Sequence, residues 1–80
     1  MQRVQLDSSL LASAGYDRNA QLLEVELRNG QHYRYFRVPP KCFQQLLKAE
    51  SKGRYFNYNI RNCFVYKRLP EAVLYVAKTK

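Results

Sequence analysis

Hydrophobic and polar residues alternate along much of the first half of the chain. Residues 22–27 read "LLEVEL", and a "YRY" run follows at 33–35. An alternation with a period of two is typical of a β-strand that buries one face. Turn-forming residues separate these runs from each other and from an earlier apolar run that ends at Tyr16. The pattern predicts a three-stranded meander with strands over residues 11–16, 22–28 and 31–38.

The second and third strands meet at Asn29-Gly30, and two pairing registers are open to them. A two-residue loop would turn Arg34 toward the apolar face of the second strand. A three-residue loop that includes Arg28, with Gly30 in a left-handed conformation, shifts the pairing by one residue and turns Arg34 toward Glu24. The same shift sends both tyrosines of the "YRY" run to the apolar face. Because a cation that faces the core is costly and an opposite-charge pair is favourable, we expect the three-residue loop.

Helical spacing replaces the alternation after residue 38. Two prolines at 39–40 end the strand and open a helix whose apolar stripe runs to about residue 49. Ser51 is a good N-cap for a second short helix, in which Phe56 and Ile60 lie four residues apart and face inward. A short extended return follows over 63–69. We expect an α+β domain: an antiparallel β-meander of three or four strands with two short α-helices packed on one face.

The charge of the chain is unevenly distributed. Its 80 residues are 46% hydrophobic, which fits one small domain with a modest core. The net charge is +8, yet residues 1–40 hold five cations and four acids, whereas residues 41–80 hold nine cations and two acids. Such an excess is typical of a domain that binds a polyanion. Small basic domains also use charge simply to stay in solution, so charge alone leaves both interpretations open.

The number of cysteines and the first ten residues indicate the cellular compartment of the protein. Cys42 and Cys63 are too few for a disulfide framework, and the opening "MQRVQLDSSL" lacks the apolar core of a secretory signal. We find no stretch with the length and hydrophobicity of a membrane span. These features predict a cytoplasmic protein with free thiols and no contact with a membrane.

The sequence contains little that indicates catalysis. His32 is the only histidine, and no cluster of histidine, cysteine and carboxylate residues has the spacing of a metal site. The three glycines form no phosphate-binding loop. A cysteine–histidine pair assembled in space stays open at this level. We expect a noncatalytic module with no metal and no cofactor.

Cations and a tyrosine share one face of the predicted second helix. Arg54, Tyr58 and Arg61 are spaced at i, i+4 and i+7, opposite Phe56 and Ile60. Guanidinium groups that bind phosphates, next to a ring that stacks on a base, suit RNA or another single-stranded nucleic acid. An ordinary solvated helix face has the same pattern. The candidate nucleic-acid-binding residues are Lys52, Arg54, Tyr58, Arg61, Lys67 and Arg68.

The segment after Pro70 supports a second hypothesis. Its apolar stretch "AVLYVA" at 72–77 could be a last strand, a docking helix or an oligomer contact. The alternative function is therefore protein–protein interaction or self-association, with a protein partner or a homodimer formed through residues 72–77.

Several stretches occur together in an order that is more specific than any one of them. They are "SSLLASAGYD", "LLEVELRNGQHYRYFRVP", "KAESKGRYFNYNIR" and the later Tyr66. This set resembles the KTSC domain, a small domain named from its place at the C-terminus of some lysyl-tRNA synthetases. The resemblance places a KTSC-like domain at 8–69, with a lead at 1–7 and a tail at 70–80 outside it.

The resemblance implies a small module that occurs both fused to a tRNA-handling enzyme and alone. The function of the family is not established, and RNA binding is its usual suggestion. The resemblance does not imply lysine activation, which belongs to the synthetase. It implies structural roles for Ser51, Gly53, Asn57 and Ile60. Arg54, Tyr58 and Arg61 fall at free positions of the family pattern.

Overall fold

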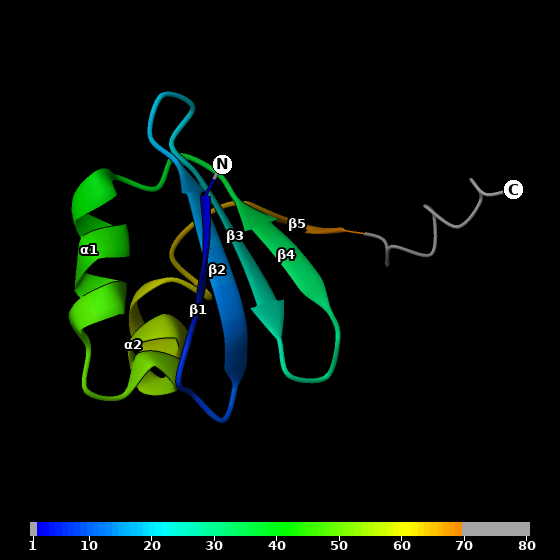
Figure 1. The fold of residues 1–80 in the computed structure, drawn as a ribbon. Coiled ribbons are helices and arrows are strands. Elements are labelled where there is room, and N and C mark those ends of the chain that lie inside the picture. The colour runs from blue at the N-terminus through cyan, green and yellow to red at the C-terminus, as the bar shows by residue number, and fades with distance from the viewer. Residues whose placement is uncertain (1, 70–80) are drawn as a thin grey trace, which may run out of the picture.

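The computed structural model describes residues 2–69, so the predicted contact segment at 72–77 lies outside the described residues. Within this range the chain forms five strands and two helices (Figure 1). In chain order they are β1 Gln2–Gln5, β2 Leu11–Asp17, β3 Leu22–Leu27, β4 His32–Tyr35, α1 Pro40–Lys48, α2 Lys52–Asn59 and β5 Tyr66–Leu69. None of the helices in this range is long and apolar enough to cross a membrane.

All five strands form one antiparallel sheet in the order β1-β2-β3-β4-β5. The predicted α+β meander is confirmed, with five strands instead of three or four. The additional strand is β1, which pairs with β2 so that Val4 lies opposite Ala14. Its sequence "QRVQ" contains a single apolar residue, because an edge strand buries little surface and needs no clear alternation.

The β3–β4 hairpin has the predicted three-residue loop. Val25 lies opposite Tyr33, and Glu24 lies opposite Arg34. Gly30 has a φ of +92°, in the region that L-residues rarely occupy. This register sends the tyrosines of β4 to the apolar face of the sheet and Arg34 to the other face.

Both helices pack on the same face of the sheet (Figure 1), as predicted. Tyr16 of β2 stacks on Phe43 of α1 with ring centroids 5.1 Å apart, and Tyr35 of β4 meets Phe56 of α2 edge to face at 5.7 Å. The fully or nearly buried core residues come from the sheet, both helices and the segments that join them: Leu6, Leu11, Ala14, Leu23, Val25, Leu27, Tyr35, Val38, Leu46, Phe56 and Ile60.

The start of α2 is fixed by two local features. The Ser51 hydroxyl accepts a hydrogen bond from the backbone N–H of Arg54 at 3.3 Å, which confirms the predicted N-cap. Gly53 lies so close to the loop before β2 that an added Cβ atom would stand 3.3 Å from the Cβ atom of Leu10. The glycine therefore lets α2 approach the N-terminal loop and form a groove with it.

Gly30→Ala should lower the free energy of unfolding by about 1 kcal/mol, because alanine is strained in a left-handed conformation. No atom lies within 4 Å of the added Cβ atom, so the backbone strain is isolated from any clash. Urea unfolding followed by circular dichroism measures the loss. Asparagine tolerates positive φ better, so Gly30→Asn should cost less. Equal stability of wild type and Gly30→Ala would contradict the three-residue loop.

Candidate functional site

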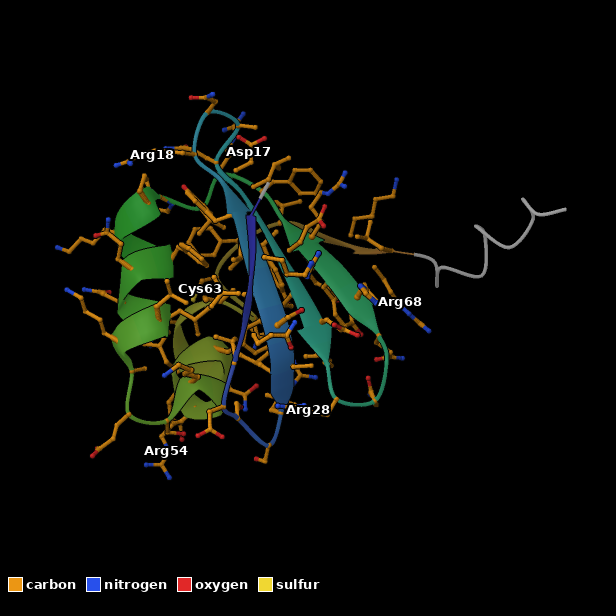
Figure 2. All side chains as sticks on the ribbon, viewed as in Figure 1. Asp17, Arg18, Arg28, Arg54, Cys63 and Arg68 are labelled. Atoms are coloured by element: carbon orange, nitrogen blue, oxygen red, sulfur yellow. The ribbon has the colours of Figure 1, made fainter. Side chains whose placement is uncertain are left out.

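The six residues predicted to bind nucleic acid lie in three places. Helix α2 ends at Asn59, and Ile60 leaves the helical conformation with a φ of −123° and a ψ of −50°. Arg61 therefore does not continue the helical face of Arg54 and Tyr58. Lys67 and Arg68 belong to β5 at the edge of the sheet. Figure 2 shows Arg54 below α2 and Arg68 beyond β4, on opposite sides of the domain.

Lys52, Arg54 and Tyr58 border an open groove of about 560 Å³ between α2 and the loop at 7–10, here called the α2 groove. The ring of Tyr58 is 74% exposed, as a stacking side chain would need to be. The same groove is also lined by Asp7 and Glu50. Two carboxylates therefore offset the two cations, which makes the groove less favourable for phosphate than the sequence indicates.

Arg61 belongs to a different cavity of about 210 Å³, here called the tyrosine pocket. Its apolar lining consists of two leucines and four aromatic residues: Leu10, Leu27, Tyr33, Tyr35, Phe56 and Tyr66. The ring centroid of Tyr66 lies 5.7 Å from that of Tyr33 and 5.5 Å from that of Tyr35. Tyr66 is 54% exposed, so this aromatic cluster opens to solvent on one side.

The rim of the tyrosine pocket is polar. It consists of Asn29 and Gln31 from the β3–β4 hairpin, and of Arg61 and Asn62 from the turn after α2. None of the residues that line the pocket is acidic. The guanidinium group of Arg61 donates a hydrogen bond to Asn57 Oδ1 at 3.2 Å, which links the pocket to a residue that lines the α2 groove.

The two cations of β5 point to opposite faces of the sheet. Arg68 lies opposite Tyr33, and Lys67 lies opposite Arg34. Directly paired residues of antiparallel strands share a face. Arg68 is therefore on the face of the tyrosine pocket, whereas Lys67 is on the face that the helices leave uncovered.

The ion pairs of the described residues use cations from the first half of the chain. Glu24 binds both Arg3 at 3.1 Å and Arg34, whose Nε donates to it at 2.8 Å. Glu26 lies 3.9 Å from His32. Within residues 2–69, the cations after residue 40 form no ion pair. These seven are Lys41, Lys48, Lys52, Arg54, Arg61, Lys67 and Arg68.

The two thiols do not form a pair with His32. Cys42 lies in α1 on the helix side, where the Tyr55 hydroxyl is 3.7 Å from its sulfur, while His32 lies on the uncovered face beside Glu26. Cys63 is exposed in the segment between α2 and β5. Among residues 2–69, no three histidine, cysteine or carboxylate side chains come together as a metal site would require.

The tyrosine pocket was not predicted from the sequence. The alternation in "YRY" correctly assigned Tyr33 and Tyr35 to the apolar face, which favoured a purely structural role for them. Tyr66 and Asn62 carry no periodic signal that connects them with these tyrosines. The pairing of β4 with β5, some thirty residues apart in sequence, brings Tyr66 to them, and the turn after α2 brings Asn62.

Stability should fall as the pH rises from 10 toward 12, because burial raises the pKa of Tyr35 from 10.0 to about 12, against the opposing positive charge of Arg61. The folded state keeps this hydroxyl protonated where the unfolded chain has lost the proton, so ionisation favours unfolding in that window. Urea unfolding across the window measures the decline. Tyr35→Phe should flatten it, although Tyr55, with a pKa of about 12, leaves a residual slope. An equally steep decline in Tyr35→Phe would contradict this assignment.

Comparison with known proteins identifies the family. The KTSC domain model matches residues 7–64. An uncharacterised protein from Stutzerimonas stutzeri is 56% identical over 57 residues, which cover 71% of this chain and 80% of that protein. A lysine–tRNA ligase from Nostoc punctiforme is 35% identical over 63 residues, or 79% of this chain but 11% of the ligase.

A solved structure supports the same assignment at the level of the fold. The crystal structure of a KTSC domain protein from Yersinia pestis superposes with a TM-score of 0.82 at 36% sequence identity. The match covers 86% of this chain and 97% of that protein. The family model, the relatives and the shared fold agree. This chain belongs to the KTSC domain family.

Proposed function

We propose that this domain binds single-stranded nucleic acid, with RNA as its natural ligand, at the tyrosine pocket and the cations beside it. One observation carries the proposal: Arg61 and Arg68 flank an aromatic cluster that opens to solvent at Tyr66 and has no carboxylate in its lining. Neither arginine forms an ion pair within residues 2–69. Guanidinium groups bind phosphates, and aromatic rings stack on unpaired bases. A single strand offers both partners at once.

The carboxylates of β3 make this arrangement possible. Glu24 and Glu26 lie on the uncovered face of the sheet, where Arg3, His32 and Arg34 are their partners. The acids of β3 are therefore paired locally, on the face of the sheet opposite the pocket. Positive charge remains on the pocket side, where it is available to a polyanion.

The α2 groove would be a secondary contact in this proposal. Leu10 lines both the groove and the pocket, and Arg61 reaches across to Asn57 of the groove. A strand that leaves the pocket past Arg61 would therefore meet Arg54 and Tyr58. The carboxylates of Asp7 and Glu50 make phosphate binding weaker there than at the pocket.

The family supports RNA as the ligand. A lysine–tRNA ligase contains a segment similar to this chain, although the similarity extends over 11% of that enzyme. Its name connects the segment with a protein that acts on tRNA, and the activation of lysine is not part of the proposal. The proposed module is noncatalytic and cytoplasmic, consistent with two cysteines that are both free thiols.

Titration of a labelled, unstructured RNA of about eight nucleotides should show binding that weakens steeply with salt. For about three phosphate contacts the affinity should fall about 20-fold between about 50 mM and about 200 mM salt. Fluorescence anisotropy measures both affinities. If no RNA binds at the lower salt concentration, the proposal is wrong.

A matched pair of variants separates the site from the net charge. Arg61→Glu with Arg68→Glu should weaken RNA binding at least tenfold, on the order expected for reversing two phosphate contacts. Lys41→Glu with Lys48→Glu changes the net charge equally on α1, whose neighbouring strands are β1 and β2. The α1 variant should lose far less affinity. Equal losses would assign the binding to overall charge and exclude the pocket.

A further inference from the structure

The interior of the tyrosine pocket is suited to one planar group. Its volume of about 210 Å³ is small, since sites for drug-sized ligands usually measure ~300–1,000 Å³. Tyr66 presents its ring toward Tyr33 edge-on, with an interplanar angle of 65°, and is tilted by 36° against Tyr35. A base that enters from the exposed side would contact these rings, and stacking of this kind tolerates any base. The interior alone therefore gives affinity without selectivity.

The rim supplies the selectivity, because it offers mainly hydrogen-bond donors. Asn29 Oδ1 accepts a bond from the backbone N–H of Gln31 at 2.9 Å, and Gln31 Oε1 accepts one from the Tyr33 hydroxyl at 3.1 Å. Each of these bonds occupies one lone pair of a side-chain oxygen and leaves the NH₂ group of that amide as a donor. With the amide of Asn62 and the guanidinium group of Arg61, the donors of the rim outnumber its remaining acceptors. Arg61 has donors only, and no carboxylate lines the pocket to accept a bond.

Bases differ in whether they offer acceptors to such a rim. Uracil and guanine carry a carbonyl oxygen where cytosine and adenine carry an amino group. A carbonyl oxygen of the base accepts hydrogen bonds from the amide and guanidinium donors. An amino group of the base is itself a donor, so it would face other donors and would lose its hydrogen bonds to water. We infer that the tyrosine pocket holds one unstacked base and selects the keto bases, uracil and guanine. This inference rests on the proposed function and specifies the ligand of the same site.

The cations of the pocket side fit a base held in this position. Arg61 lies on the rim, and Arg68 lies beside Tyr33 across the β4–β5 pairing. The phosphates on the two sides of an inserted base would each find a guanidinium group. A nucleotide within a strand should therefore bind more tightly than a free nucleoside, and base selection is best measured without the phosphates.

Neutral nucleosides in matched pairs test the selection. Uridine and cytidine differ on one edge of a pyrimidine, and inosine and adenosine differ on the corresponding edge of a purine. NMR titration of the ¹⁵N-labelled domain follows the side-chain amides of Asn29, Gln31 and Asn62. We expect these signals to shift with uridine and inosine, and dissociation constants at least about fivefold lower than for cytidine and adenosine. Whichever of uridine and inosine binds with the lower dissociation constant shows whether the pocket prefers a pyrimidine or a purine.

Two neighbouring variants locate the site. Tyr66→Ala removes a ring of the pocket and should weaken uridine binding at least about fivefold. Val65→Ala truncates the exposed neighbouring side chain, which does not line the pocket, and should leave uridine binding unchanged. The dispersion of the NMR spectrum reports whether each variant is folded. If Tyr66→Ala is not, Asn62→Ala replaces it and should reduce the preference for uridine over cytidine.

Each contrary result has a separate meaning. Equal affinities for uridine and cytidine, with the pocket amides shifting, would overturn the selection of keto bases. If the short RNA shifts the pocket signals but no nucleoside does, the inference of a selected base is overturned and the proposed function stands. If the RNA does not bind either, both are overturned.

Discussion

The pairing register of the β3–β4 hairpin is the constraint on which the rest of the structure depends. Gly30 at a φ of +92° gives the loop three residues, so Tyr33 and Tyr35 face the helices while Arg34 faces Glu24. A register shifted by one residue would bury the arginine and expose both tyrosines. The contact between the sheet and α2, the tyrosine pocket and the ion pairs of the uncovered face would all be lost together.

The same register determines where the charges remain. It places the carboxylates of β3 on the uncovered face, within reach of Arg3 and Arg34. The acids of β3 are paired there, on the face of the sheet away from the helices. Within residues 2–69, the positive charge of the second half lies on α1, α2, β5 and the turn that contains Arg61. At the tyrosine pocket this charge lies beside aromatic rings, and no acid lines the pocket. The positive charge and the aromatic surface of the tyrosine pocket therefore lie together because of the conformation of the β3–β4 turn.

Local structure could be predicted because it depends on neighbouring residues. Alternation identified β3 and β4, and an apolar run bounded by turn residues identified β2. Ser51 together with Phe56 identified the start and the buried face of α2. Strand β1 was missed because its short polar sequence has no period. The spacing of Arg54, Tyr58 and Arg61 was correct for a helix, but α2 ends at Asn59, and nothing in the local sequence marks that end.

The sequence by itself determined the α+β class, the hairpin register, the inward faces of both helices and the excess of positive charge. Each of these follows from periodicity, turn chemistry or composition, which act over a few residues. Only the tertiary structure decided which cations and rings lie together. The pocket joins Tyr33 to Tyr66 through the pairing of β4 with β5, and it joins both to Arg61 through the packing of α2. Such contacts depend on long-range pairing, for which a single sequence carries no spacing signal.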